Sequence, residues 1–244
     1  MSSPASAQDE SLRRIGEAER YNAWLFARAQ PFLGPRILDV GAGLGTFTAI
    51  LAGTAERVLA LEPDAGDAAQ LRQRFAGDER VAVEELDATQ LAGADIGGPF
   101  DAAICFNVLE HIPDDVGALR GVRQQLDPGA HLLVLVPAHQ ALFGEIDRTV
   151  GHVRRYDRRT LDRALTAGGF DVRELRYVNP LGALGWLVSS RLLRREHIPE
   201  GPLKAYDALV PVLRALDKLP LPFGLSVWAV AKTPGSVSAS AAKA

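Results

Sequence analysis

Residues 41–45 carry a glycine at every second position, directly after the apolar stretch 36–40. Such a stretch is typical of a buried parallel strand, and the glycines allow a sharp turn that brings a ligand close to the backbone. The dinucleotide fingerprint would need a glycine at Thr46. Asp39 precedes the turn and would repel a diphosphate, but not a ligand with an amino group or a sulfonium. The turn therefore favours the second kind of ligand, although an ordinary βα turn shows the same spacing.

Two more acids each follow a predicted strand. Glu62 comes after residues 58–61 and can accept hydrogen bonds from both hydroxyls of a ribose, or it is an ordinary exposed residue. Asp87 and Ala88 come after residues 81–86, and the Asp87 carboxylate either accepts from an adenine amine or caps the next turn. The carboxyl ends of parallel strands meet at one edge of a sheet, so both acids belong to the same predicted site.

Residues with acid–base chemistry follow the predicted strand 131–136. His139, His152 and Tyr156 are the candidates for a base that removes a proton from a hydroxyl acceptor. Histidine suits this task because its unperturbed pKa lies near neutrality. His139 is the first choice because it lies close to the end of the strand. Alternatively, both histidines lie in surface loops.

The same region is rich in arginine. Arg154 and Arg155 could hold a carboxylate or phosphate of a substrate, whereas such a run is usually a solvated face. Phe143 and Trp186 are the aromatic candidates for the substrate pocket.

Strands and helices alternate along most of the chain, which predicts an α/β fold with a doubly wound, mostly parallel sheet. A helix is expected over residues 12–30, where Tyr21 either packs or belongs to a lid over the ligand. Residues 179–223 are apolar and helix-like, and they are interpreted as a lid, a dimer surface or a segment on a membrane. The strands are expected at residues 36–40, 58–61, 81–86, 100–106, 131–136, 171–178 and 225–231.

Composition limits the classes of function. The chain has 244 residues, 47% of them hydrophobic, which suits one α/β domain over residues 11–233 between disordered ends at 1–10 and 234–244. A net charge of −3 gives no general attraction to nucleic acid. Cys105 is the single cysteine, so no internal disulfide is possible, and no metal site is predicted. No apolar stretch is long enough to span a membrane, and a cytoplasmic location is expected.

Taken in order, these motifs resemble those of the class I S-adenosylmethionine-dependent methyltransferases, in their small-molecule branch. The resemblance extends over residues 36–137 and rests on the glycine turn, Glu62, Asp87–Ala88, the segment Asn107-Val108-Leu109-Glu110-His111 and Leu126-Asp127-Pro128-Gly129. It implies a seven-stranded sheet with an antiparallel last strand, and S-adenosyl-L-methionine as the cofactor. The helical insertion between strands six and seven departs from the many relatives that have a tight turn there.

The resemblance also implies a function and a cofactor site. The expected reaction is in-line methyl transfer to a hydroxyl or amine of a small molecule, such as a natural-product intermediate or a sugar. The alternatives are a lipid or lipid-linked substrate at a membrane surface, a non-catalytic cofactor-binding protein and an NAD-dependent oxidoreductase. The protein is expected to be a monomer or homodimer. The implied cofactor residues are Tyr21, Asp39, Gly41, Ala42, Gly43, Glu62, Pro63, Asp87, Ala88, Asn107, Leu109 and His111.

Overall fold

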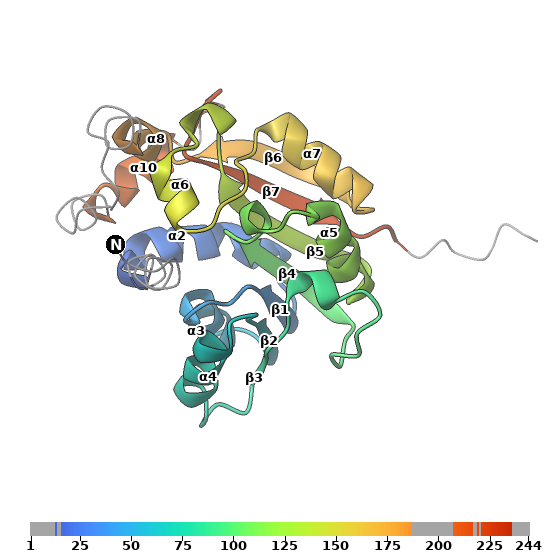
Figure 1. The fold of residues 1–244 in the computed structure, drawn as a ribbon. Coiled ribbons are helices and arrows are strands. Elements are labelled where there is room, and N and C mark those ends of the chain that lie inside the picture. Colours follow the sequence, from blue (N-terminus) through green and yellow to red (C-terminus); the bar gives the residue numbers. More distant parts are fainter. Residues whose placement is uncertain (1–12, 14–15, 187–206, 217–218, 220, 236–244) are drawn as a thin grey trace, which may run out of the picture.

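The computed structural model describes residue 13 and residues 16–186, 207–216, 219 and 221–235, with 184–186 described in their backbone only (Figure 1). The disorder expected for residues 1–10 concerns residues outside this described part, as does that expected for residues 234–244 except at Pro234 and Gly235. The middle of the 179–223 insertion also lies outside it.

The core of the molecule is one seven-stranded sheet with the strand order β3-β2-β1-β4-β5-β7-β6. Strands β1 to β5 pair in parallel, and β7 is antiparallel to both of its neighbours, β5 and β6. The predicted doubly wound sheet with an antiparallel last strand is therefore confirmed. The strands are β1 Arg36–Val40, β2 Arg57–Leu61, β3 Val81–Glu84, β4 Phe100–Phe106, β5 Leu126–Pro137, β6 Asp171–Val178 and β7 Ser226–Lys232.

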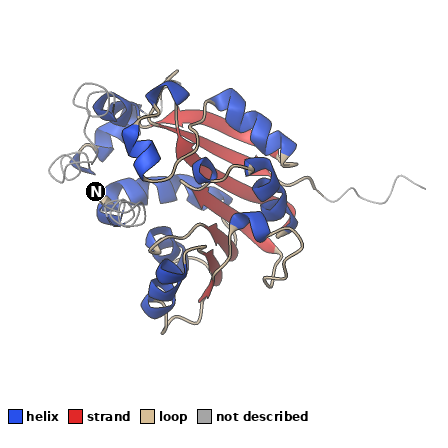
Figure 2. Cartoon of the chain, viewed as in Figure 1, coloured by secondary structure: helices blue, strands red, loops and turns tan. Residues whose placement is uncertain are grey.

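Helices cover both faces of this sheet (Figure 2). The α-helices are α2 Glu19–Ala29, α3 Thr46–Ala52, α4 Ala65–Arg74, α5 Asp115–Gln124, α6 Glu145–Thr149, α7 Arg158–Ala167, α8 Pro180–Trp186 and α10 Val210–Leu216. Short 3₁₀ helices are η1 Gln30–Phe32, η2 Ala88–Gln90, η3 Leu109–His111 and η4 Gln140–Leu142.

Successive residues of the central strands point to opposite faces and fill two separate cores. Ile37 of β1 packs in the core with residues of α2, α3 and α10. Its neighbour Leu38 packs in the core with residues of α5 and α7, the two helices that lie together on one side of the sheet in Figure 1. Because both faces are buried, the parallel strands are continuous apolar stretches. Each fully buried leucine or isoleucine contributes about 1.5–3 kcal/mol to folding.

Aspartates set the starts of three helices that follow strands or site loops. Asp64 accepts from the backbone N–H groups of Gly66 and Asp67 at the start of α4, at 2.8 and 3.0 Å. Asp114 and Asp157 cap α5 and α7 in the same way. Each cap satisfies N–H groups that have no partner within the helix, and so fixes where the preceding loop must end.

The structure corrects three of the predicted boundaries by two residues or more. Strand β3 ends at Glu84, whereas the sequence predicted residue 86. The helix expected over 12–30 is interrupted at Ala18, so that α2 begins at Glu19. Strand β5 begins at Leu126, whereas the sequence predicted a turn at residues 127–129 and a strand from 131. Leu126 pairs with Phe100, and the ladder then shifts its register before Ala102. Pairing with β4 therefore overrides the local preference of the Asp-Pro-Gly sequence for a turn.

A helical insertion joins β6 to β7, as predicted. Its described parts, α8 and α10, contact each other, and α10 also contacts α2. Just before α10, the Asp207 carboxylate accepts from the backbone N–H groups of Arg20 and Tyr21, at 3.3 and 2.9 Å. The insertion is thus attached to the start of α2. Among the described helices, none combines the length and apolar character needed to cross a membrane.

Candidate functional site

The glycine turn after β1 has the geometry that the sequence predicts. Gly41, Gly43 and Gly45 all have left-handed backbone conformations, with φ values of 72°, 54° and 79°. Gly41 is additionally constrained by space, since a Cβ there would collide with the side chain of Val108. The turn is closed by a 2.8 Å hydrogen bond from the Ala42 N–H to the carbonyl of Leu61 at the end of β2. The residues after β1 and β2 are therefore held together at one edge of the sheet.

Two buried carboxylates lie at this turn. The Asp39 side chain accepts a 2.6 Å hydrogen bond from the hydroxyl of Thr48 in α3. Glu62 turns back over the glycines: one oxygen accepts from the Gly43 N–H at 2.8 Å and the other from the Asp64 N–H at 3.0 Å. Glu62 is therefore not the ordinary exposed residue that was the alternative, because it is only 6% exposed.

Burial controls the protonation of both acids. It raises the pKa of Asp39 to about 6, a shift that the Thr48 hydroxyl opposes and the charge of Glu62 increases. It also raises the pKa of Glu62, although the two backbone N–H groups act in the opposite direction. Within the described chain, no cationic side chain forms an ion pair with either acid. The turn thus holds negative charge that no cationic side chain of the described residues neutralises.

Three of the other predicted cofactor positions, Asp87–Ala88, Pro63 and Tyr21, are described by their local contacts and burial. Asp87 caps η2, accepting from the Thr89 N–H at 2.8 Å, so the capping role left open by the sequence is present. Ala88 is buried and Pro63 is exposed. Tyr21, on α2, lies with its ring centroid 5.4 Å from that of Trp24.

Strand β4 ends in a strained residue beside the glycine turn. Asn107 has a φ of 55°, and its N–H donates to the carbonyl of Leu135 in β5 at 2.8 Å. Non-glycine residues in this conformation cluster at functional sites. Leu109, predicted at the cofactor, has its side chain in the apolar core. Val108 contacts Gly41, so the β4 end and the glycine turn are neighbours.

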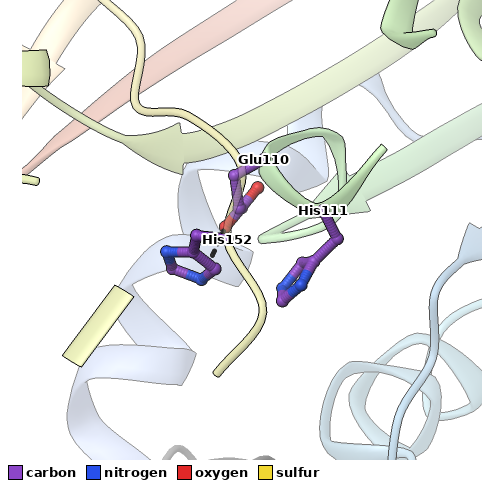
Figure 3. Close-up of side chains that lie close together, drawn as sticks. All are labelled: Glu110, His111 and His152. Carbon is purple, nitrogen blue, oxygen red and sulfur yellow. Dashed lines mark ion pairs between the residues drawn. The ribbon is translucent and has the colours of Figure 1, made fainter. Parts of the chain in front are cut away.

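A second cluster of polar side chains follows directly. Glu110 and His111 come from η3, and His152 comes from the loop after α6; Figure 3 shows the three side chains gathered in one place. The His152 Nδ1 lies 2.8 Å from the Asp147 Oδ1, and its Nε2 lies 3.8 Å from the Glu110 Oε1. The rings of His111 and His152 meet edge to face, with centroids 4.7 Å apart.

The protonation of this cluster is also set by burial. Burial raises the pKa of Glu110 to about 8, and the charge of Arg155 acts against this shift. Burial and the neighbouring His152 lower the pKa of His111 to about 4. Burial alone would raise the pKa of Asp147, but hydrogen bonds with His152 and Arg155 lower it below its usual value. Asp147 is therefore an ionised acceptor that orients the His152 ring.

Tyr156 and Arg154 do not have the surroundings expected of a base and a substrate ligand. The Tyr156 hydroxyl lies 2.7 Å from the Asp115 Oδ2 and 3.2 Å from the Leu109 carbonyl. Burial and this carboxylate raise the pKa of the Tyr156 hydroxyl, which keeps it protonated at neutral pH. Arg154 binds the same Asp115 carboxylate at 2.7 Å and the carbonyl of Pro113. Both residues serve as internal supports.

Arg155 points inward, as the substrate-binding interpretation required and a solvated face would not, and its guanidinium binds other groups of the protein. Its side chain is 2% exposed, and its Nε donates to the Asp147 Oδ1 at 2.8 Å. Its Nη1 donates to the Ala138 carbonyl at 3.2 Å. Phe143 is half-buried beneath the Arg148 guanidinium, and Trp186 lies in α8, its side chain outside the described part.

His139 lies apart from the histidine pair. It has a φ of 63°, and its ring stacks on Tyr177 of β6 with centroids 4.6 Å apart. Burial lowers the pKa of its imidazole. Among the described ring contacts, the first-choice base is therefore paired with Tyr177, whereas His152 is paired with His111.

Sequence reasoning missed Glu110 as a site residue, and it considered Asp147 only as a residue behind the candidate histidines. Glu110 adjoins His111 at the end of a parallel strand, and this adjacency was the available signal. Asp147 precedes His152 by five residues, and this spacing does not by itself predict a contact. The contact forms because the loop between the two residues folds back. The contact between the two segments depends on tertiary structure.

The two carboxylate clusters lie on either side of one strand. Cys105, near the end of β4, has its pKa raised by burial and then by the charges of both Glu110 and Asp39. Val108 packs on Gly41 two residues before Glu110. β1 and β4 are neighbours at the point where the strand order reverses, and open α/β sheets bind ligands at such a point.

A parallel sheet with one antiparallel strand inserted before its edge, a glycine turn after β1 and an acid at the end of β2 together define the class I S-adenosylmethionine-dependent methyltransferase class. Comparison with known proteins agrees. A family model described as "Methyltransferase domain" matches residues 13–175, more than half of the 244-residue chain. The chain belongs to this family.

Individual relatives match part of the chain. A ubiquinone biosynthesis O-methyltransferase of Xanthomonas axonopodis pv. citri is 35% identical over 117 residues, 46% of each chain. A demethylmenaquinone methyltransferase of Clavibacter sepedonicus is 30% identical over 132 residues, 54% of this chain and 53% of the relative. The chain thus spans about half the length of the curated relatives it matches.

A solved structure extends the comparison of the fold. The S-adenosylmethionine-dependent methyltransferase of Mesorhizobium loti superimposes with a TM-score of 0.60 at 20% identity, covering 86% of this chain and 97% of the other. At this identity the comparison concerns the fold alone.

Proposed function

We propose that the chain transfers the methyl group of S-adenosyl-L-methionine to a hydroxyl oxygen of a small molecule. The observation that carries this proposal is the pair of buried carboxylates at the glycine turn, Asp39 and Glu62. Taking negative charge out of water is costly unless an opposite charge accompanies it. A ligand with a sulfonium and an ammonium group supplies that charge, whereas the diphosphate of NAD would add to the repulsion.

The residues at the turn fit this cofactor. Each Glu62 oxygen accepts one backbone hydrogen bond and keeps acceptor capacity for a ribose hydroxyl. The methionine part would lie along Asp39 and the glycine turn, with Tyr21 and the backbone near Asn107 beside it. Adenine would lie beside Ala88, with its exocyclic amine donating to the Asp87 carboxylate. When bound, the cofactor supplies an electrophilic methyl group, and the protein's task is to align the acceptor and exclude water.

We place the acceptor against the cluster of Glu110, His111 and His152. This cluster lies across β4 from the glycine turn, and it offers groups that can promote loss of a hydroxyl proton. Support for an oxygen acceptor comes from the relative named as a ubiquinone biosynthesis O-methyltransferase. Hydroxylated quinone precursors are therefore the first acceptors to test, followed by the sugars and amines that the sequence left open.

A lipid-linked or strongly apolar acceptor is the second candidate. The observation that favours it is the row of exposed hydrophobic side chains in the described parts of the insertion. Leu209, Val212, Leu219 and Phe223 are each between 41% and 52% exposed. In this reading residues 179–223 form a lid that receives the apolar part of the substrate.

Isothermal titration calorimetry with S-adenosylmethionine, S-adenosylhomocysteine and NAD tests the first step. We expect the first two to bind and NAD to bind weakly or not at all; the reverse order would reject the proposal. Transfer of a labelled methyl group to hydroxylated quinone precursors, compared with amine analogues, then tests the acceptor. Co-sedimentation of the chain with phospholipid vesicles tests the apolar alternative, which predicts binding that is lost in the Leu209→Ser and Phe223→Ser variants.

A further inference from the structure

The cluster beyond β4 has the donor set of a metal site. Glu110, His111 and His152 each offer one ligand atom, and these atoms all lie within 4.8 Å of one another. Ligands of one transition-metal ion, with bonds of about 2.1 Å, lie roughly 3–4 Å apart. The three side chains, seen together in Figure 3, therefore need to close only slightly around an ion.

An independent observation comes from Glu110. Its side chain is 0% exposed, and neither carboxylate oxygen has a hydrogen-bond partner from another residue of the described chain. Buried polar groups are almost always paired, and a buried carboxylate without donors lacks what its lone pairs require. The oxygens face His152, whose Nε2 is 3.8 Å from the Oε1, too far for a hydrogen bond. A cation between these atoms would satisfy both.

The surroundings of His152 point the same way. Its Nδ1 lies 2.8 Å from the Asp147 Oδ1, which leaves the Nε2 as the free ligand atom facing Glu110. Asp147 is itself fixed by the Arg155 Nε and by the N–H of Gly144, both at 2.8 Å. Metal-binding histidines are usually oriented in this way, by a carboxylate on the other ring nitrogen. Asp147 is thus a positioning residue for the cluster.

We propose that Glu110, His111 and His152 bind a divalent transition-metal ion. Two imidazole nitrogens and one carboxylate oxygen suit Zn²⁺, Mn²⁺ or Co²⁺ better than Mg²⁺ or Ca²⁺, which prefer sets of oxygen ligands. Three protein ligands leave coordination positions open. The proposal departs from the sequence-based expectation of no metal, which considered only cysteine clusters.

The catalytic role of the site rests on the proposed function. An ion held by these three residues would have an open position for the acceptor hydroxyl and would lower the pKa of its O–H. The hydroxyl proton leaves to water. The oxygen then forms a bond to the methyl carbon while the sulfur–methyl bond breaks, and the electron pair stays on sulfur. His152 acts here as a ligand, so no separate base is required.

Metal binding can be measured without any methyl donor or acceptor. The tag-free full-length chain, stripped with a chelator and dialysed, is titrated calorimetrically with Mn²⁺ or Zn²⁺. We expect one ion per chain, and with Co²⁺ the visible absorption of an ion with nitrogen ligands. Glu110→Gln and His152→Gln should each weaken binding at least about a hundredfold, and Asp147→Asn about tenfold to a hundredfold.

Two matched variants serve as controls. Glu145→Gln changes an exposed acid on α6, and His131→Gln changes a histidine of β5 whose ring contacts Phe32; both should bind metal like the wild type. Circular dichroism on heating checks that each variant is folded, and the isosteric Glu110→Gln serves if His152→Gln is not.

Two outcomes would overturn the metal site: wild-type protein that binds no ion stoichiometrically, or Glu110→Gln that binds as tightly as wild type. The calorimetry of S-adenosylmethionine separates this failure from failure of the proposed function. A chain that binds the cofactor and no metal refutes the metal site alone. A chain that binds metal and no cofactor refutes the methyl-transfer function and leaves the metal site standing.

Discussion

Replacement of Glu62 by glutamine tests the cofactor site most directly. The variant keeps the length and shape of the side chain and removes its charge. In the wild type, the two carboxylate oxygens accept from the backbone N–H groups of Gly43 and Asp64. A carboxamide has one acceptor oxygen, so one of these N–H groups would face an amide donor, and the capacity to bind a ribose would fall with it.

The expected loss of cofactor affinity follows from the hydrogen bonds that the substitution removes. A hydrogen bond to a charged group contributes about 1.5–3 kcal/mol, and 1.4 kcal/mol corresponds to a tenfold change in affinity. Loss of one such bond to the ribose is expected to weaken the cofactor roughly ten- to hundredfold. S-adenosylmethionine and S-adenosylhomocysteine should lose affinity equally in Glu62→Gln, because both carry the same ribose.

Calorimetry with both ligands measures this effect, and urea unfolding shows whether the variant is folded at the assay temperature. Glu84→Gln, at the exposed end of β3, is the control and should bind like the wild type. The reasoning would be refuted by folded Glu62→Gln protein whose affinities lie within about threefold of wild type, a change of under 1 kcal/mol.

Three further predictions concern pH and stability. Because burial raises the pKa of Asp39 to about 6, protonation below that pH removes an attraction for the cationic cofactor; calorimetric affinity should fall as pH drops through 6, and Asp39→Asn should flatten the profile. Gly41→Ala combines a φ of 72° with a collision against Val108 and should lower the urea unfolding free energy by about 2 kcal/mol or more. Tyr156→Phe loses the bond to Asp115, so stability should fall by about 1 kcal/mol with kcat unchanged, whereas a hundredfold loss of kcat would restore Tyr156 as a base.

Much of the fold could be predicted from local patterns. Strands β1, β4 and β6 have the bounds that the sequence indicated, because each is an apolar or alternating stretch between clear turn residues. The start of β5 was missed because Asp127, Pro128 and Gly129 prefer turns when considered alone. Asp127 forms a 2.8 Å ion pair with Arg36 at the start of β1, and the neighbouring strand supplies the pairing. Neither the ion pair nor the strand pairing can be predicted from a local sequence pattern.

The candidate site likewise has one part that local patterns predict and another part that depends on tertiary contacts. The glycine turn and the acids after β1 and β2 are local features of parallel strands, and the sequence located them. The partners of Arg154 and Arg155 could not be predicted because charge says nothing of which carboxylate lies opposite: Asp115 binds the first and Asp147 the second. Glu110 and His152 are distant in sequence, and only the loop after α6 brings them together.

The arrangement of charge across β4 links the two proposals. On one side, Asp39 is buried beside the glycine turn; on the other, Glu110 is buried beside two histidines, and both carboxylates influence Cys105 between them. Burial raises the pKa of each acid, so a cation bound beside either one would stabilise its ionised form. The two proposed cations are the cofactor's sulfonium at the turn and the metal ion at Glu110. Two like charges repel, so bound Mn²⁺ should weaken binding of S-adenosylmethionine, which carries the sulfonium charge, more than that of S-adenosylhomocysteine, which lacks it. Calorimetry of both ligands with and without Mn²⁺ measures this difference; a metal ion that strengthens binding of S-adenosylmethionine more than that of S-adenosylhomocysteine would contradict it.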